Sequence, residues 1–392
     1  MEKINKSLLK LANKKNLEIS ISNQSNSAKL FWKRFISKKV NIFALSFFLI
    51  IVFLLIFALF FIKYSATTPI YNSKFINNLP SQFSPIVKQH FERGADLEFI
   101  RKVAELEKNR AAANGTTPIF KILYDSAFDS GGDLTTKTDI VILYYNPYDL
   151  IKAINLNNIS SNKINLKHFS ILGTNNDGID IFSRIFTSII ITFLILLGTI
   201  FINIIIGFSF GAFVALKNDK WYAKILDSIA TIINSIPELL WIFLLCIFMG
   251  TNNWAIALSF ILISWTSFYE LAKNETLELR KQEFILAAKA IGLNQTQIIY
   301  RHLFIKIFPM LLILITDKLA INILIVSSLA FLDFLISSNS LNIGVIFKEA
   351  ISMISTNVSY ILVLTIAITL FSVSLKLFSN AISTTYNPKI VK

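Results

Sequence analysis

The segment from Ile42 to Ile62 contains twenty-one residues and no charged side chain. As an α-helix it would be about 30 Å long, which matches the thickness of the hydrocarbon layer of a membrane. A helix satisfies its own backbone hydrogen bonds, so it is stable in lipid, where no water is present. Five further segments are mostly apolar, at about Ile185–Leu216, Leu226–Met249, Trp254–Ala272, Ile307–Leu335 and Val358–Phe378. We therefore predict an all-α polytopic membrane protein with six transmembrane helices.

Composition and charge agree with a membrane protein and argue against a nucleic-acid-binding protein. Hydrophobic residues make up 54% of the 392 residues, and charged residues only 16%. The net charge of +14 lies mainly beside the apolar segments, since the first 41 residues hold ten basic and two acidic residues. Such basic residues favour the cytoplasmic side and anionic lipid headgroups. The lipid membrane is therefore an expected partner, and no nucleic acid is expected.

The basic residues also predict the orientation in the cell membrane. With the basic N-terminal segment in the cytoplasm, six crossings place both termini there. The short loop Gly250–Asn253, predicted on the outer side, has no charge, whereas the predicted inner loops are rich in Lys and Arg. The predicted parts are a cytoplasmic segment 1–41, a first transmembrane helix 42–62, an extracellular module 63–183, a five-helix core 184–380 with a cytoplasmic loop 273–306, and a cytoplasmic C-terminus 381–392.

The predicted extracellular stretch is long and mixed in composition. The segment Asp96–Ala112 has apolar residues at helical spacing, and Asp139–Tyr145 has the pattern of a strand. Gly131 and Gly132 mark a turn between them. We expect a small α+β extracellular insertion, and a partly ordered loop is the alternative.

The predicted cytoplasmic loop carries the most informative pattern, KQEFILAAKAIGLNQTQIIYRHLFIKIFP from Lys281 to Pro309. Gly292 is suited to the left-handed position that ends a helix. Asn294 and Gln297 have the spacing of a capping box that begins the next helix. The loop is therefore predicted to contain two short helices with a break between them.

The first of these short helices has features of a docking element. Ala287 and Ala288 are small, so a partner surface could approach closely. Glu283 and Lys289 lie on either side of them. The sequence thus predicts that another protein binds here.

This loop resembles the EAA loop of binding-protein-dependent ABC importers. That motif is Glu-Ala-Ala, then Gly four residues after the second Ala, then an apolar stretch ending in Pro. The wider pattern is most similar to the C-type permease subunit of oligopeptide and dipeptide importers. Leu286 departs from it, because the family usually has Glu there. The matching positions are Glu283, Phe284, Ala287, Ala288, Gly292, Arg301, His302 and Pro309.

Other stretches resemble the same subfamily in order and spacing. They are Asn78–Pro80, GTNNDGID at Gly173–Asp180, SSLAFLDFL at Ser327–Leu335 and NPK at Asn387–Lys389. The resemblance therefore covers most of the chain outside about residues 90–167.

The resemblance implies a membrane permease subunit of an ABC importer that translocates oligopeptides or dipeptides. Its implied partners are a second permease subunit, two cytoplasmic ATPase subunits and an extracellular substrate-binding lipoprotein. ATP and Mg would be bound by the ATPases, and no cofactor is expected in this chain. The loop residues Glu283, Ala287, Ala288, Lys289, Gly292, Arg301 and His302 would dock on the ATPase.

Charged residues within the predicted membrane helices are candidates for the translocation pathway. An unpaired charge there costs about 2.5–3.5 kcal/mol, so Asp317 and Lys318 should face the bundle interior or another charge. Glu238 follows Pro237, which is expected to kink the third helix. Glu238 lies either in a polar pathway or near the inner half of the membrane.

Two glycines in the second predicted crossing indicate helix packing. Gly207 and Gly211 form a small-xxx-small pattern, which lets two helices approach closely.

No enzyme motif is present in the sequence. His90, His168 and His302 are far apart, no HExxH pattern occurs, and Cys246 is the only cysteine, so no metal or catalytic site is predicted. A P-loop lysine is also missing, which predicts a transport subunit without its own ATPase site. The alternative function is a membrane-anchored sensor or enzyme that acts through the extracellular module.

Overall fold

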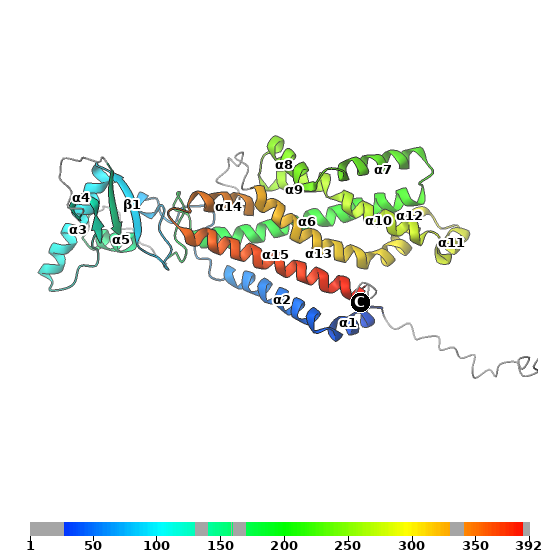
Figure 1. Ribbon diagram of the computed structural model, residues 1–392, viewed down its shortest axis with the longest axis horizontal. Coiled ribbons are helices and arrows are strands. Elements are labelled where there is room, and N and C mark those ends of the chain that lie inside the picture. Colours follow the sequence, from blue (N-terminus) through cyan, green and yellow to red (C-terminus); the bar gives the residue numbers. More distant parts are fainter. Residues whose placement is uncertain (1–26, 130–139, 158, 160–169, 330–340, 387–392) are drawn as a thin grey trace, which may run out of the picture.

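The computed structural model describes residues 27–129, 140–157, 159, 170–329 and 341–386. A long helical bundle carries a small α+β module at one end (Figure 1). We call this the module end of the bundle. The opposite end, where α11 lies, is the loop end (Figure 1).

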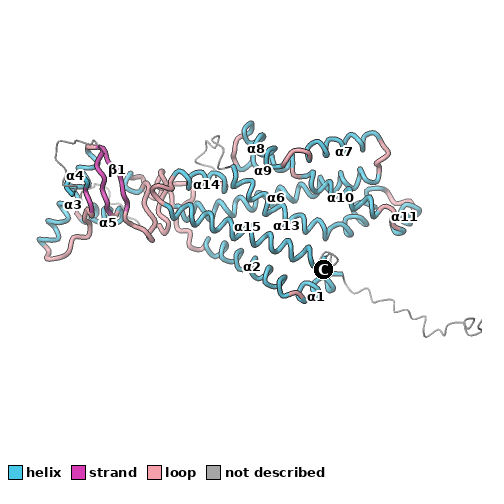
Figure 2. The backbone as a smooth tube through the Cα atoms, viewed as in Figure 1, coloured by secondary structure: helices cyan, strands magenta, loops and turns pink. Residues whose placement is uncertain are grey.

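The bundle is almost entirely helical (Figure 2). Its helices before the loop are α1 (Ser27–Ser37), α2 (Lys39–Leu59), α6 (Ile181–Leu216), α7 (Trp221–Asn234), α8 (Glu238–Met249), α9 (Asn253–Ile263) and α10 (Trp265–Leu279). Those of the loop and beyond are α11 (Glu283–Ala290), α12 (Gln295–Gln297), the π-helix η4 (Ile298–Leu303), α13 (Phe304–Ser328), α14 (Ile343–Ser352) and α15 (Val358–Tyr386).

Five helical segments of the described residues are long and apolar enough to cross a membrane, and a sixth crossing results if α7 and α8 form one span. The five are Lys39–Leu59, Ile181–Leu216, Asn253–Leu279, Gln295–Ser328 and Val358–Tyr386. The predicted polytopic helical fold is therefore confirmed.

The third predicted crossing, Leu226–Met249, corresponds to two helices, α7 and α8. α7 and α8 are bent by 88° at the break between Asn234 and Glu238. Pro237 lies in the break with φ −52° and ψ 132°, and it has no N–H to continue the α7 hydrogen bonds. A sharp bend, stronger than the expected kink, is the result.

Two other predicted boundaries also changed. α13 ends at Ser328, and residues 330–335 of the fifth predicted crossing lie outside the described residues. α15 continues beyond Phe378 to Tyr386. Asn387–Lys389 lies outside the described part.

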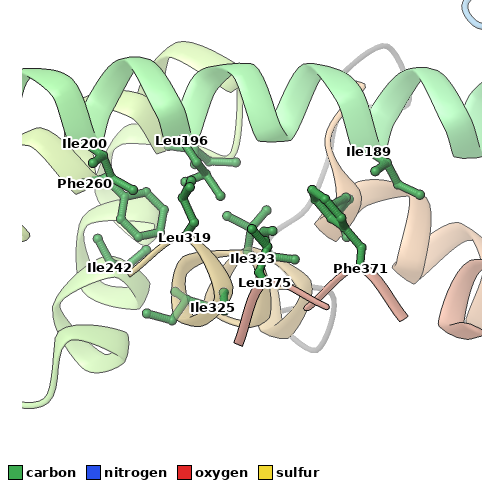
Figure 3. Close-up of a cluster of buried hydrophobic side chains, with 14 of the residues drawn as sticks. Ile189, Leu196, Ile200, Ile242, Phe260, Leu319, Ile323, Ile325, Phe371 and Leu375 are labelled. Carbon is green, nitrogen blue, oxygen red and sulfur yellow. The ribbon is translucent and has the colours of Figure 1, made fainter. Parts of the chain in front are cut away.

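The centre of the bundle is an apolar contact between α6, α13 and α15. Figure 3 shows side chains of all three helices meeting in this cluster. The buried residues are Ile189, Leu196 and Ile200 from α6, Leu319 and Ile323 from α13, and Phe371 and Leu375 from α15.

α6 and α10 pack with their backbones in close contact at Gly207 and Gly211. A Cβ at Gly207 would lie 2.5 Å from Trp265 O, and a Cβ at Gly211 would lie 2.3 Å from Tyr269 O. Larger side chains at either position would therefore force the two helices apart.

The module contains a three-stranded antiparallel sheet in the order β1-β3-β2. Its elements are η3 (Lys74–Ile76), β1 (Val87–Glu92), α3 (Ala95–Ala113), β2 (Tyr124–Asp125), α4 (Ser126–Asp129), β3 (Ile140–Tyr145) and α5 (Pro147–Leu156). α3 and α5 bury one apolar cluster with the sheet, including Leu97, Val103 and Leu143. The predicted helix, strand and α+β insertion are confirmed, whereas Gly131 and Gly132 lie outside the described residues.

Two segments far apart in the sequence meet where the module joins the bundle. Thr174 N donates to Leu79 O at 3.1 Å, and Leu79 N donates to Thr174 Oγ1 at 3.0 Å. Gly173 has a φ of +82°, and a Cβ there would lie 2.0 Å from Leu79 O, so the position requires glycine. Asp180 then caps α6 by accepting a hydrogen bond from Ser183 N at 2.8 Å.

A substitution at Gly211 tests the α6–α10 contact. Gly211→Leu should lower the stability of the detergent-purified chain by about 2 kcal/mol, because the side chain overpacks the helix contact. Gly198→Leu is the matched control, since Gly198 lies on the same helix and a Cβ there would meet no neighbouring atom within 4 Å. Thermal unfolding checks both variants, and equal midpoints would contradict this packing.

The buried Glu107 makes the module sensitive to acid. Arg110 donates to both carboxylate oxygens, at 2.7 and 2.9 Å, and Ile119 N donates at 3.0 Å. The pKa of Glu107 is lowered from 4.5 to about 2, mainly by the hydrogen bonds from Arg110 and further by those from Ile119 N and Asn157, and burial partly opposes this effect. Since the folded-state pKa lies below the unfolded value, this stabilisation is present above pH 4.5 and is lost as the pH falls towards 2.

We expect Glu107→Gln to destabilise the module by about 2 kcal/mol at pH 7 and by about half as much at pH 3, where the folded-state carboxylate is still mostly ionised. Glu105→Gln is the control, because Glu105 is exposed on the same helix. Calorimetry at both pH values measures the difference. A Glu107→Gln effect that does not depend on pH would show that the carboxylate charge is not responsible.

Candidate functional site

The loop between α10 and α13 forms two short helical segments with a break. α11 is followed by Gly292, whose φ of +87° is the left-handed conformation predicted for it. Asn294 and Gln297 then form the predicted capping box, in which Asn294 N donates to Gln297 Oε1 at 3.0 Å. The loop projects from the end of the bundle opposite to the module (Figure 1).

The predicted docking residues differ in exposure. Ala288 is buried and belongs to the bundle core, so its side chain holds α11 in place and does not face a partner. His302 is half-buried. The exposed residues are Glu283, Ala287, Lys289, Gly292 and Arg301.

The exposed surface of α11 and its C-cap residue also carries apolar side chains. Leu286, at the position that departs from the family motif, is 52% exposed, and Ile291 is 80% exposed. Two apolar side chains therefore lie on the free surface beside Glu283 and Lys289.

The loop is tied to α6 on both sides. Arg280 donates to Ala215 O at 2.7 Å, at the end of α10. The hydroxyl groups of Tyr300 in η4 and Ser209 in α6 lie 2.5 Å apart and are hydrogen-bonded. A displacement of α11 and η4 would therefore act directly on α6.

Asp317 and Lys318, neighbours on α13, form two separate ion pairs. Lys318 Nζ lies 2.6 Å from Glu238 Oε2, and the two side chains are only 12% and 17% exposed. Ser264, between α9 and α10, donates to the other oxygen of Glu238. The carboxylate of Glu238 thus connects three places in the bundle: the break between α7 and α8, the junction between α9 and α10, and the middle of α13.

The second ion pair, between Asp317 and Lys376 of α15, is more open. Its side chains are 30% and 51% exposed. It lines a cavity of about 360 Å³ that also contains the polar residues Asn380 and Ser383. The two neighbouring charges of α13 therefore have different surroundings, one pair enclosed and one open.

The helix α2 shows how deep this open pair lies. α2 is 21 residues long, which corresponds to about one hydrocarbon thickness. Asn41, near its start, donates to Thr385 at 2.8 Å, and Phe48, halfway along it, stacks on Phe378 with ring centroids 4.9 Å apart. Lys376 is two residues from Phe378, so its ion pair lies near the middle of the span.

A second polar cavity, of about 240 Å³, lies between α7 and α10 in the loop half of the bundle. Asn234 donates to Glu270 at 2.7 Å, and Tyr269 donates to Asp227 at 2.7 Å. Lys273 also forms an ion pair with Asp227.

These polar residues were missed from the sequence, because α7 was taken as the start of an apolar crossing. The signal was present, since Lys224, Asp227, Thr231 and Asn234 recur three or four residues apart and share one face of α7.

No metal-binding cluster is found among the residues that the structure describes. No three His, Cys, Asp or Glu side chains there come together as metal ligands. His90 lies on β1 of the module, and His168 lies outside the described residues. Cys246 is buried in α8.

Comparison with known proteins relates the C-terminal part of the chain, which contains these sites, to membrane transport. A family model described as "Binding-protein-dependent transport system inner membrane component" matches residues 207–392. The match includes α11, η4, both ion pairs and both polar cavities, and it does not include the module.

Two curated relatives have related descriptions. A putative peptide permease protein of Brucella abortus biovar 1 is 27% identical over 166 residues, which are 42% of this chain and 54% of that protein. A dipeptide transport system permease protein of Lactococcus lactis subsp. cremoris is 20% identical over 219 residues, which are 56% of this chain and 64% of that protein. The chain thus spans about half the length of the Brucella relative.

The enclosed ion pair can be tested by a double-mutant cycle. Lys318→Met should destabilise the chain by about 3 kcal/mol, because it leaves Glu238 charged and unpaired in a buried position. Adding Glu238→Gln removes that charge and should recover most of the loss. Thermal unfolding in detergent measures all four proteins, and a double variant no more stable than Lys318→Met would mean that the charges are not coupled.

Proposed function

Because residues 207–392 match the family model of binding-protein-dependent transport system inner membrane components, we propose that the chain is a permease subunit of an ABC importer for oligopeptides or dipeptides. The observation that carries this proposal is the α11–η4 loop, which presents an exposed helix at one end of a membrane-spanning bundle. ATP hydrolysis in separate ATPase subunits, which bind ATP and Mg, would drive transport.

The distribution of charge supports a cytoplasmic position for the loop end. The described ends of the chain, α1 and the end of α15, lie at the same end of the bundle as α11 (Figure 1). Basic residues are frequent in the loops there, including Lys217, Lys220, Lys281 and Arg301. Both termini are then cytoplasmic, and the module is extracellular.

ATPase docking would use the exposed face of α11. Glu283 and Lys289 offer one negative and one positive charge, with Leu286 and Ile291 as apolar contacts. The bonds from Arg280 and Tyr300 to α6 would transmit a movement of the ATPases into the bundle. Each bundle conformation is favoured by the contacts that the ATPases make with it.

The open ion pair marks the face that meets the translocation path. A charge exposed to lipid near mid-membrane is costly, so Asp317 and Lys376 require protein or water around them. A second permease subunit on this face would supply both, by enclosing a water-filled path along the polar cavity. Glu238 and Lys318, which form the enclosed pair, would fix the bend between α7 and α8 beside that path.

The remaining partners follow from the type of transporter. Cargo would be delivered by an extracellular substrate-binding lipoprotein, and the names of the two relatives favour peptides as cargo. A role as a membrane-anchored sensor or enzyme has no specific observation in its favour among the described residues.

Co-purification tests the proposal directly. The chain, expressed with its host's ATPases and solubilised in mild detergent, should retain two ATPase subunits and one further permease. A variant that lacks α11 but still folds should no longer retain the ATPase subunits. A folded chain that never retains an ATPase would overturn the proposed function.

Gly292 tests the shape of the docking loop. Gly292→Val should reduce peptide uptake into proteoliposomes containing the assembled transporter by about tenfold or more, because a β-branched residue strains the left-handed position by about 1–2 kcal/mol and redirects α11. Gly115→Val in the module is the matched control, since Gly115 has a φ of +63° and, like Gly292, open space around it. Equal uptake by both variants would contradict the role of the loop.

A further inference from the structure

We propose that the module binds an extended peptide as an added strand along the free edge of β1, in a cavity between the module and the α14–α15 turn. This inference rests on the proposed function, because it takes the cargo of the transporter to be a peptide. It places the peptide-pairing strand, β1, in a part of the chain that the family match does not cover.

The hydrogen bonds of β3 show that β1 has a free edge. Ile142 N donates to Ser126 Oγ at 2.9 Å, and Tyr144 O accepts from Leu123 N at 2.8 Å, so both β3 residues direct these groups away from β1. In an antiparallel pair, directly opposite residues point their backbone groups either towards each other or both away.

His90 lies opposite Ile142, and Lys88 lies opposite Tyr144. The N–H and C=O groups of His90 and Lys88 therefore point away from the sheet. Within the described part of the chain, β1 pairs with no strand other than β3. Such an edge is a template for a further strand.

A cavity of about 390 Å³ lies along this strand. Its walls include Lys88 and Gln89 of β1 and, from the bundle, Ser355 and Thr356 between α14 and α15. The volume falls within the roughly 300–1,000 Å³ typical of small-ligand sites. The cavity is therefore shared by the module and the bundle, and it can hold a few residues of an extended chain.

The chemistry of the walls suits a peptide without a defined sequence. An added strand would pair its backbone with His90 and Lys88, and these bonds do not depend on side-chain identity. Phe75 and Phe91 offer apolar contacts, whereas Lys88 and Asp96 offer charges for the peptide ends. Backbone recognition of this kind fits cargo of varied sequence.

The bundle wall opposite β1 leaves room for a free peptide but not for a folded partner protein. Adjacent strands lie about 4.8 Å apart, so one extended chain needs little width. A folded partner would need to bring its own sheet against β1, where Ser355 and Thr356 already form the opposite wall. From this turn α15 leads to Lys376 near the middle of the span, so a bound peptide would lie at the outer end of a helix that lines the proposed path.

Binding to the full chain in lipid nanodiscs, without ATPases, tests this inference. The probe is the peptide Ala-Val-Thr-Val-Ala-Lys with fluorescein on the Lys side chain, followed by fluorescence anisotropy. The same peptide with alternate backbone amides N-methylated should bind about tenfold more weakly or worse, because it cannot donate to the strand edge. Equal binding of the two probes would overturn the inference.

Variants of His90 locate the site on β1. His90→Pro removes the outward N–H without removing a bond to β3, and should weaken binding about tenfold. His90→Ala keeps the N–H and should stay within about twofold of the original chain. Equal binding by these two variants, with both folded by thermal unfolding, would overturn the inference.

Ser355→Trp tests the site from the bundle side. It replaces the His90→Pro test if that variant does not fold. Ser355 is exposed, so the indole should fill the cavity from the bundle side and weaken binding. Unchanged binding would overturn the inference. Uptake by the assembled transporter is measured separately: normal uptake without binding to the module overturns this inference alone, whereas binding without any ATP-driven uptake overturns the proposed function alone.

Discussion

The ion pair between Lys318 and Glu238 ties the bend at Pro237 to the middle of α13. A break in a membrane helix leaves backbone groups without partners, and lipid offers none. Here the break is at Pro237, which has no N–H to satisfy, and the carboxylate beside it is bound by Lys318 and Ser264. The charges at the break thus satisfy one another, and Trp241 Nε1 donates to the backbone carbonyl of Ile233 at 2.9 Å, next to the end of α7.

Much of the bundle could be predicted from the sequence, because lipid imposes a simple rule of length and apolarity on each span. The capping box at Asn294 was also predictable, since its residues are three positions apart. The sequence placed Asp317 and Lys318 against the bundle interior or another charge, but it did not identify their partners. Lys318 and Glu238 are 80 residues apart and Asp317 and Lys376 are 59 apart, and only tertiary packing decides which charges meet. The burial of Ala288 escaped prediction for the same reason, since a small residue in a docking motif does not reveal which side faces the bundle.

The module shows a different limit of sequence-based prediction. Its longest helix and central strand have clear local patterns, so they were predicted within about one residue. The order β1-β3-β2 and the free edge of β1 depend on pairing between segments about 50 residues apart, which local patterns do not encode. The binding site proposed there therefore required the structure, as did the contact between Gly173 and Leu79 that joins the module to the bundle.

The helix α6 connects the two ends of the molecule mechanically. Its 36 residues extend over about 54 Å without a break. At the loop end it is bonded to Arg280 and Tyr300, and at the module end it is capped by Asp180, beside the contact with Leu79. If α6 moves as a rigid body, a displacement that begins at the loop would also move the junction under the module. A cavity formed by the module and the bundle together would change shape in that movement, so the two proposed sites would be coupled through α6.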